Sequence, residues 1–371
     1  MTDAAAYQRI LLVKPSSLGD VIHALPVLHG LRVRFPDAHI AWLISTACAP
    51  VIRHHPDVSE VIEFDRRRYG RITRSLRISR EFAGFVADLR TRRFDLAIDL
   101  QGLFRSGFLT FASGAPVRIG FRGAREFAWL FYTHEIPVSD PDAHAVDKNF
   151  GVAGLLDFAD VPIRFDLAVT EAERNQAADL LRGAGIDLSR PFAAVLPGAR
   201  WDTKRWLPER YASVLSRLAV ERGLRSVLLG APFEADLCAA IDSQVSAENN
   251  LKPVSLAGWT GLRELVAVLE RAAVVVCQDS APAHLAAALG RPTVCILGPT
   301  NSRRTGPYGV GARLIQADLP CSPCYLRSLS QCRFGHECMH QVEVDTVVDA
   351  VVEQFDLLSA ARTGPADGRS S

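Results

Sequence analysis

The chain has 371 residues, of which 48% are hydrophobic and 22% are charged. This length exceeds what one compact core usually serves and predicts two domains, and the composition is that of a globular enzyme. A net charge of +1 excludes global attraction to nucleic acid, so we expect no nucleic-acid partner. No apolar run reaches membrane-spanning length, and the first residues lack the pattern of a secretion signal. We therefore expect a cytoplasmic protein with reduced cysteines.

Short β-rich runs alternate with longer helical patterns along almost the whole chain. In the first half the expected strands are Ile10–Val13, Ile40–Ile44, Val61–Phe64, Leu96–Leu100 and Val117–Gly120. In the second half they are Phe192–Leu196, Ser226–Leu229, Pro253–Leu256, Val274–Cys277, Val294–Leu297 and Leu314–Gln316. The alternation predicts parallel sheets covered by helices on both faces. We expect an α/β protein with one doubly wound sheet in each half, and a ligand crevice at the carboxyl ends of the strands.

The domain boundaries follow from the same pattern. A short helix and the linker that begins at Asp160 separate the two sets of strands, which gives domains 1–160 and 161–360. The tail, residues 361–371, is small, polar and rich in Gly and Pro, and we expect it to be disordered.

The first strand runs into a turn of small residues, Lys14-Pro-Ser-Ser-Leu-Gly-Asp20, and then into a helix. Two interpretations of Asp20 stay open. Ser17 and Asp20 have the three-residue spacing of a capping box. A carboxylate at the mouth of the crevice could also act as a general base. Because Gly19 is the turn's one glycine, the G-x-G-x-x-G pattern of a dinucleotide-dependent oxidoreductase is missing.

Residues 66–80 contain seven arginines and no acidic residue, with Ile72, Leu76 and Ile78 between them. A solvated helix face is the usual explanation of such a run. A surface for a phosphorylated acceptor or for an anionic membrane is the alternative.

Two turns in the second half carry polar residues directly after strands. In LPGARWDTKRWLPE, Gly198 permits unusual backbone angles and Lys204 is suited to phosphate oxygens, whereas Trp201 and Trp206 are expected to anchor the loop. In LLGAPFE, Glu234 could accept hydrogen bonds from ribose hydroxyls or simply stand at a helix N-terminus.

A third turn, within residues 274–299, joins a strand to a helix through Gln278-Asp279-Ser280. Ser280 could cap the helix, Pro282 suits its first turn, and Ala281 would let a ligand approach the backbone. Because the first N–H groups of a helix lack internal partners, this turn predicts an anion site, with a plain βαβ unit as the alternative.

The eight cysteines fall into two groups. Four lie among apolar residues and are expected in the interior: Cys48, Cys238, Cys277 and Cys295. The other four are clustered, with two, seven and five residues between successive members: Cys321, Cys324, Cys332 and Cys338. This spacing suits a structural zinc site, and a reduced cysteine-rich loop is the alternative.

Five motifs, taken in order, resemble those of glycosyltransferase family 9, which includes bacterial ADP-heptose:lipopolysaccharide heptosyltransferases. They are VKPSSLGDVIHALPVL, LPGARWDTKRWLPERY, LLGAPFE, QDSAPAHLAAALGRPTVCILGPT and GPYG. The resemblance implies a GT-B architecture of two Rossmann-like domains, the first for the acceptor and the second for the nucleotide-sugar. It further implies an inverting, metal-independent transfer with no required cofactor. The expected substrates are ADP-heptose and a glycolipid, Kdo-lipid A or heptosyl-Kdo-lipid A, met at the inner face of the cytoplasmic membrane.

The resemblance also implies roles for individual residues. Asp20 would be the general base and Lys204 would neutralise the donor diphosphate. The remaining donor-side residues would be Gly198, Glu234, Asp279, Ser280, Ala281 and His284. The acceptor-side residues would be Lys14, Ser16, Ser17, Gln101, Gly102 and Arg105.

One departure bears on the substrate. Relatives commonly carry glycine where this chain has Ala281, and alanine at a positive φ would be strained. A different nucleotide-sugar or a protein acceptor is therefore the alternative function. A non-catalytic nucleotide-sugar binding protein is disfavoured, since Asp20, Lys204 and Asp279 are all present.

Overall fold

A computed structural model describes residues 7–248, 250–309 and 311–363. The chain divides into two compact units, Met1–Ala168 and Val169–Ser371. The division falls a few residues after the expected one, because the connecting segment stays on the first unit: Asp166 Oδ2 lies 3.2 Å from His29 Nδ1.

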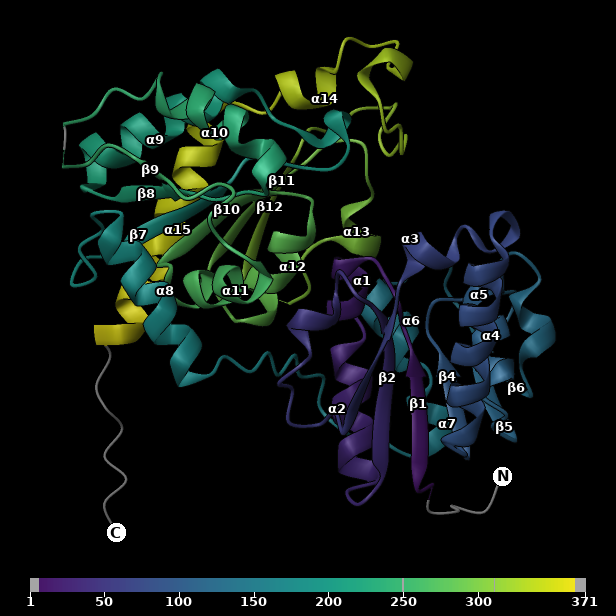
Figure 1. The fold of residues 1–371 in the computed structure, drawn as a ribbon. Helices are drawn as coiled ribbons and strands as arrows, with labels where there is room; N and C mark the ends of the chain where they lie inside the picture. Colours follow the sequence, from purple (N-terminus) through teal and green to yellow (C-terminus); the bar gives the residue numbers. More distant parts are fainter. Residues whose placement is uncertain (1–6, 249, 310, 364–371) are drawn as a thin grey trace. The chain divides into compact units, whose positions relative to one another are not determined.

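The first unit is a parallel sheet of six strands with helices on both faces (Figure 1). Its strands are β1 (Arg9–Val13), β2 (His39–Ser45), β3 (Glu60–Phe64), β4 (Leu96–Asp99), β5 (Val117–Phe121) and β6 (His134–Ile136), in the order β3-β2-β1-β4-β5-β6. Its helices are α1 (Leu18–Ile22), α2 (Leu25–Arg34), α3 (Arg66–Tyr69), α4 (Leu76–Thr91), α5 (Phe104–Ala112), α6 (Ala145–Phe150) and α7 (Ala153–Leu156). Short 3₁₀ turns are η1 (Ala49–Val51), η2 (Ile72–Arg74) and η3 (Ala128–Phe131).

The second unit repeats this plan. Its strands are β7 (Phe192–Leu196), β8 (Arg225–Leu228), β9 (Val254–Ser255), β10 (Val274–Gln278), β11 (Thr293–Leu297) and β12 (Ala312–Gln316), in the order β12-β11-β10-β7-β8-β9. Its helices are α8 (Glu171–Gly183), α9 (Pro208–Arg222), α10 (Ala235–Asp242), α11 (Leu262–Arg271), α12 (Ala281–Ala288), α13 (Ser302–Thr305), α14 (Glu337–His340) and α15 (Val344–Thr363). Its 3₁₀ turns are η4 (Asp202–Lys204), η5 (Pro232–Glu234) and η6 (Leu329–Gln331).

Both sheets have the doubly wound order in which the first strand of the unit lies between the second and the fourth. Here β1 pairs with β2 and β4, and β7 pairs with β8 and β10, all in parallel. The chain direction of the crossovers reverses between β1 and β4 and between β7 and β10, and the carboxyl ends of such strand pairs are where these sheets bind ligands. The predicted α/β fold is confirmed.

Two predictions at the level of elements need correction. All eleven predicted strands are present, but β6 was missed because its three residues, His134–Ile136, include two polar ones and give no apolar run. The predicted disordered tail is wrong for residues 361–363, since α15 continues to Thr363. The rest of that tail lies outside the described residues.

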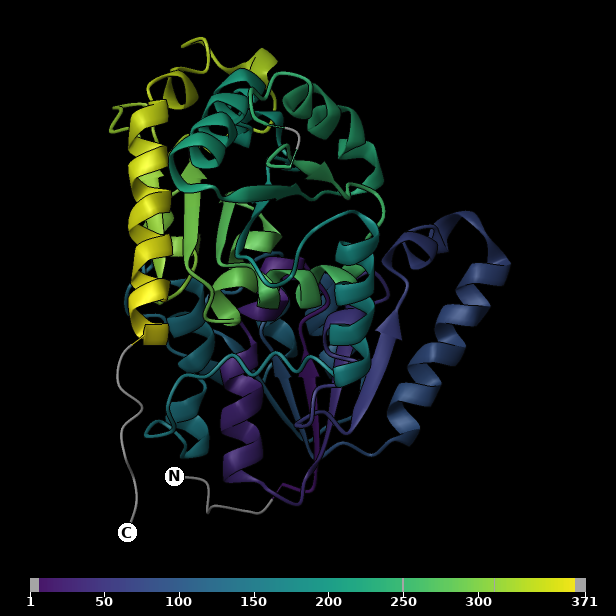
Figure 2. The same ribbon diagram turned by 90° about the vertical axis from the view of Figure 1, so that its left-hand side faces the viewer.

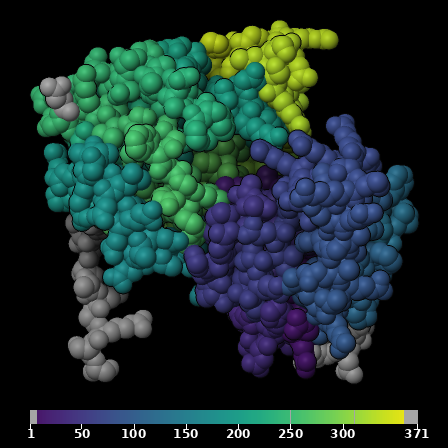
Figure 3. All heavy atoms as spheres, in the orientation of Figure 1, coloured from purple at the N-terminus to yellow at the C-terminus, as the bar shows by residue number. Residues whose placement is uncertain are grey.

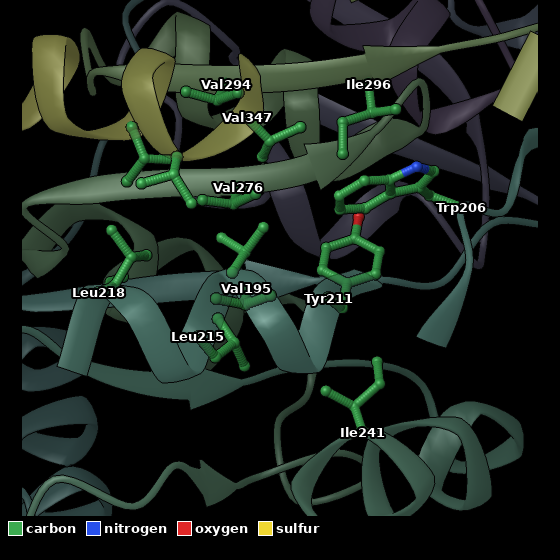
Figure 4. Packing of buried hydrophobic residues seen from close by; sticks show 14 of the residues in the cluster. Val195, Trp206, Tyr211, Leu215, Leu218, Ile241, Val276, Val294, Ile296 and Val347 are labelled. Carbon is green, nitrogen blue, oxygen red and sulfur yellow. The ribbon is translucent and has the colours of Figure 1, made fainter. Parts of the chain in front are cut away.

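Alternation along the strands builds a core on each face of a sheet. In the first unit, Leu11 and Val13 of β1 face a cluster that includes Leu89 of α4 and Leu109 of α5. In the second unit, α9 and α15 pack on β7, β10 and β11 with a cluster that includes Trp206 (Figure 4). Figure 2 shows α15 running along this sheet.

Local signals explain where the helices of the second unit begin and end. Thr170 caps α8 in a capping box with Glu173, whose carboxylate also pairs with Arg263 of α11. Pro208 opens α9, and Gly223, at a φ of +59°, closes it in the left-handed conformation. Within the described ranges, no helix is both long and apolar enough to cross a membrane.

Candidate active site

A buried carboxylate organises the carboxyl edge of the first sheet. Asp99, at the end of β4, is fully buried and accepts hydrogen bonds from the Gln101 and Gly102 N–H groups (2.8 and 3.1 Å) and from the Tyr132 hydroxyl (2.7 Å). Burial raises the pKa of Asp99, and these hydrogen bonds oppose the rise. Gly102 has a φ of +67°, which explains the glycine there. The loop that carries Gln101 and Gly102, two of the predicted acceptor residues, is thus held in place by the buried Asp99 carboxylate.

Lys14 follows β1 at the same edge. Its Nζ donates to the Leu100 carbonyl (2.6 Å), and the side chain is almost fully buried. Burial lowers the pKa of Lys14, while the carboxylates of Asp20 and Asp99 oppose that shift. Lys14 therefore lies within electrostatic range of both carboxylates, although its hydrogen bond goes to the backbone.

Asp20 occupies the first turn of α1, where Oδ2 accepts from the Ser17 N–H (2.9 Å) and the Ser17 hydroxyl (2.6 Å). The capping interpretation of this pair is therefore confirmed. These two bonds hold the carboxylate at the start of α1.

A cavity of ≈ 180 Å³ lies beside this turn. It is lined by Pro15, Ser16, Phe64, Arg66, Gln101, Leu103, Arg105, Ser106 and Glu126. Gln101 Oε1 accepts from the Ser16 N–H (3.4 Å), and Arg66 Nη1 lies 3.4 Å from Ser16 Oγ. Ser16, Gln101 and Arg105, which the sequence placed on the acceptor side, thus share one cavity, and Arg66 is a lining residue that motif reasoning did not single out.

The second sheet carries a lysine–aspartate pair at its carboxyl edge. Lys204 Nζ lies 2.7 Å from Asp279 Oδ2 and donates to the Asp279 carbonyl (3.1 Å). The side chains are 16% and 3% exposed, and Thr300 Oγ1 donates to the same carboxylate oxygen. Lys204 also lies over the Trp201 ring, 4.7 Å from its centroid. Two residues far apart in the sequence are therefore joined as one charged unit.

Gln278, fully buried at the end of β10, holds the Lys204 loop in place. In the amide orientation that satisfies its neighbours, its nitrogen donates to the Ile296 and Lys204 carbonyls and its oxygen accepts from the Tyr211 hydroxyl and the Trp206 N–H. The Trp206 indole is buried, as predicted for a loop anchor. Lys204 is thus positioned by a buried polar network rather than by a flexible loop.

The turn after β10 places Ser280 at the N-cap of α12, as predicted, but its hydroxyl makes no capping bond. Instead Ser280 Oγ lies 3.5 Å from the Gln278 carbonyl. Ala281 is the first helical residue and is not among the residues with positive φ, so alanine there is unstrained. His284 lies one turn further on and is buried. The first turn of α12 lies next to Asp279 and hence to the Lys204 ammonium.

Gly198 and Glu234 meet at the ends of β7 and β8. A Cβ atom on Gly198 would lie 2.0 Å from Glu234 Oε1, so only glycine fits there with the carboxylate in place. Glu234 Oε2 accepts from the Ala231 N–H (2.8 Å) and closes its turn. Two predicted donor-side residues are therefore in direct contact.

The clustered cysteines lie in the segment between β12 and α15, which packs on the Lys204 loop. His336 Nε2 lies 2.8 Å from the Thr203 carbonyl, the Thr203 hydroxyl donates to the Leu326 carbonyl (2.6 Å), and Arg327 lies over the Trp201 ring. Sequence reasoning missed this support, because these contacts join segments more than one hundred residues apart.

In the part of the chain that the structure describes, the four clustered cysteines, Cys321, Cys324, Cys332 and Cys338, do not form a preformed ligand group. Among the described residues, the three-ligand group close enough to share an ion is His29, Asp57 and Asp166, and the cysteines form none. Burial and, after it, the neighbouring thiols of Cys324, Cys332 and Cys321 raise the pKa of Cys338 to about 11. All eight cysteines are free, and the four predicted in the interior are buried. The structural zinc site and the reduced cysteine-rich loop thus both stay predictions.

The arginine-rich run forms α3, η2 and the start of α4 at the outside of the first unit. Arg68 and Arg77 pair with Glu81, while Arg67, Arg71, Arg74 and Arg80 are exposed. Leu76 is 80% exposed. Most of the run is thus a solvated face, and Arg66 alone of its arginines lines the cavity described above.

Two Rossmann-like sheets, each with polar and charged residues gathered at its ligand-binding edge, define a GT-B type of protein, the architecture of many nucleotide-sugar transferases. Comparison with known proteins narrows this class. The model of glycosyltransferase family 9 (heptosyltransferase) matches residues 83–334. Lipopolysaccharide heptosyltransferase 1 of Pseudomonas aeruginosa is 35% identical over 85% of this chain and 86% of its own. Lipopolysaccharide heptosyltransferase 2 of Escherichia coli is 27% identical over 94% and 98%.

Solved structures agree with the sequence matches. Escherichia coli ADP-heptose heptosyltransferase II superposes with a TM-score of 0.75 at 25% identity, covering 95% of this chain and all of that one. The Escherichia coli heptosyltransferase WaaC with ADP-2-deoxy-2-fluoro heptose gives a TM-score of 0.72 at 26% identity, with the same coverage. The chain belongs to glycosyltransferase family 9.

Proposed function

We propose that this glycosyltransferase transfers heptose from ADP-heptose to the lipopolysaccharide inner core, with Kdo-lipid A or heptosyl-Kdo-lipid A as acceptor. The observation that carries the donor side is the buried Lys204–Asp279 pair beside the first turn of α12. The named relatives are lipopolysaccharide heptosyltransferases, and a related structure holds an ADP-heptose analogue.

In this proposal the second unit binds the donor. An ammonium group has three N–H donors, and Asp279 accepts two from Lys204, which leaves one for a diphosphate oxygen. The N–H groups of the first turn of α12, at Ser280 and Ala281, supply further positive potential. Glu234, held beside Gly198, would accept hydrogen bonds from the ribose hydroxyls. His284 would bound the sugar side of the same turn.

The first unit would bind the acceptor. Ser16, Gln101 and Arg105 line a cavity in which an anionic sugar would find hydrogen-bond donors, and Gly102 holds the loop's left-handed turn. Lys14, buried at the same sheet edge, would add positive charge.

The chemical step is a displacement at the anomeric carbon. The acceptor hydroxyl oxygen forms the new bond while the bond to the diphosphate oxygen breaks, and the bonding pair leaves on ADP. Asp20 would take the hydroxyl proton as attack proceeds, so configuration inverts. Lys204 and the α12 N-terminus would stabilise the charge that develops on the diphosphate, so we propose a metal-independent reaction.

A glycolipid acceptor is held in a bilayer. We therefore propose that the protein works in the cytoplasm in peripheral contact with the inner membrane surface, where the exposed arginines of residues 66–80 would meet anionic head groups.

The test is the Asp20→Asn variant, with Asp37→Asn, an exposed turn residue, as matched control. The asparagine side-chain oxygen can still accept from the N–H of the N-cap residue Ser17, so the fold should survive. We expect transfer from ADP-heptose to Kdo-lipid A to fall by a factor of about 10²–10⁴ while calorimetry shows unchanged donor affinity. Near-normal turnover would remove Asp20 from the role of base.

The donor identity needs a separate experiment, because another nucleotide-sugar or a protein acceptor is the second candidate. ADP-, UDP- and GDP-sugars would be offered to the native enzyme with each acceptor. Preference for ADP-heptose and the glycolipid supports the proposal, and a preference for another pair replaces it.

A further inference from the structure

Five large apolar side chains are exposed together on the outer part of the first unit. We call them the aromatic surface: Phe104 and Phe111 of α5, and Phe127, Trp129 and Leu130 of η3 and its N-cap, exposed to 51%, 53%, 67%, 44% and 62%. Clustered exposed apolar residues mark interaction sites, whereas scattered ones are ordinary. Figure 1 shows α5 at the edge of the unit that also carries α4, β5 and β6.

The two α5 rings of this surface pack on η3. The half-buried Phe131 ring lies between the two α5 residues, with its centroid 5.4 Å from that of Phe104 and 5.9 Å from that of Phe111. Gly107 lets α5 and η3 approach, because a Cβ atom there would lie 2.8 Å from the Phe131 ring. The two segments that carry the aromatic surface, α5 and η3, are therefore packed directly against each other.

Positive charge borders this layer. Arg118 lies over the Phe111 ring, 5.5 Å from its centroid, and Arg105 and Arg125 are exposed on the same two segments. The helix α4, which begins inside the arginine-rich run, packs on α5, since its Phe82 ring stacks on Phe108 with the centroids 6.2 Å apart. In the space-filling view, α4 and α5 belong to the blue part of the first unit (Figure 3). Aromatic rings with an arginine rim suit the head-group region of an anionic bilayer.

The aromatic surface is continuous with the acceptor cavity. Leu103 and Arg105, on either side of Phe104, line that cavity, and so does Glu126, the residue before Phe127. The Phe104 N–H donates to Glu126 Oε2 (3.2 Å), which ties the two segments together at the cavity rim. A bilayer in contact with the aromatic surface would bring glycolipid head groups directly to the cavity.

We propose that the aromatic surface docks the first unit on an anionic lipid bilayer, with Phe127, Trp129 and Leu130 inserted among the head groups. This inference rests on the proposed function for its substrate, a glycolipid, but its lipid contact can be measured without any transfer reaction.

The experiment is co-sedimentation of the full-length protein with vesicles of phosphatidylcholine alone or with phosphatidylglycerol. The test variant is Phe127→Ser/Trp129→Ser/Leu130→Ser, and Val220→Ser, 75% exposed on α9, is the matched control. Serine tolerates the left-handed φ of 59° at residue 127 at modest cost, and circular dichroism would verify the fold. We expect binding to the anionic vesicles only, weakened about tenfold or more in the triple variant and unchanged in the control. A fluorescence blue shift on vesicle addition should vanish in Trp129→Phe, which still binds.

The outcomes are separable from those of the transfer reaction. With acceptor embedded in vesicles, the triple variant should lose transfer, but with a de-acylated, water-soluble acceptor it should keep the native rate. Equal vesicle binding by native and triple-variant protein, or no binding by either, would overturn the inference. So would a native dimer in light scattering that the triple variant breaks, since a second copy would then cover this surface. If no acceptor is used by the native protein, the proposed function fails while the vesicle result still stands.

Discussion

Replacing Lys204 by methionine separates a structural from a binding role of the ammonium group. At the observed 2.7 Å, the Lys204–Asp279 attraction is about 6 kcal/mol for an effective dielectric constant of about 20. Desolvation cancels much of it, but removing one partner leaves the other charge buried and uncompensated, which costs about 3–5 kcal/mol. Because Lys204 is 16% exposed and Thr300 still donates to the carboxylate, we expect a loss of about 3 kcal/mol.

The assay is a double-mutant cycle by denaturant unfolding and by calorimetric ADP binding. Lys204→Met/Asp279→Asn should recover most of the lost stability, because no buried charge is then left unpaired. Its ADP affinity should stay about 10–100-fold below native, as for Lys204→Met, because the charge-assisted bond to diphosphate is still missing. Lys252→Met, at an exposed site, is the control.

Two results would refute this reasoning. Native stability in Lys204→Met would mean that the Asp279 charge is not buried without its partner. Recovery of ADP affinity together with stability in the double variant would mean that Lys204 acts by neutralising Asp279 and makes no contact with the diphosphate.

Three further perturbations follow from the contacts described. Gly198→Ala should weaken ADP binding, measured by calorimetry, without unfolding the protein. The new methyl group would lie 2.0 Å from Glu234 Oε1 and must push that carboxylate aside. Unchanged ADP affinity would contradict a contact between Glu234 and the ribose. Tyr132→Phe should lower the free energy of unfolding by about 1–3 kcal/mol, because the buried Asp99 carboxylate loses a hydrogen-bond donor. An unchanged free energy of unfolding would argue against that hydrogen bond. The arginine partner of Glu173 lowers the pKa of that carboxyl from 4.5 to about 2, so its contribution is present above pH 4.5 and is lost as the pH falls toward 2. Glu173→Gln should therefore lower the free energy of unfolding by up to about 3 kcal/mol at pH 7. It should also reduce the fall in that free energy, measured by urea unfolding, as the pH drops from 4.5 toward 2. An unchanged fall would mean that other groups cause the loss of stability in acid.

The sequence predicts the sheets well because parallel buried strands are continuous apolar runs, whereas β6, with His134 and Glu135, has no such run. The polar turn residues could also be located from the sequence, because each turn directly follows one of these apolar runs. Their partners could not be predicted. That Asp279 meets Lys204, or that Gly198 abuts Glu234, depends on which strands are neighbours, and strand order is not readable from local patterns.

A shared arrangement at the two sheet edges explains why these two positions carry charge. In each unit a buried aspartate ends the fourth strand or follows it, next to the loop after the first strand, where the crossover direction reverses: Asp99 beside Lys14, and Asp279 beside Lys204. The two units use the arrangement differently. Lys14 is buried and donates to the Leu100 carbonyl, so it stiffens its loop. Lys204 keeps partial exposure and a carboxylate partner, so in our proposal it would present a fixed cation to the donor. A polyanionic diphosphate needs the second arrangement, which is why the donor belongs to the second unit in our proposal.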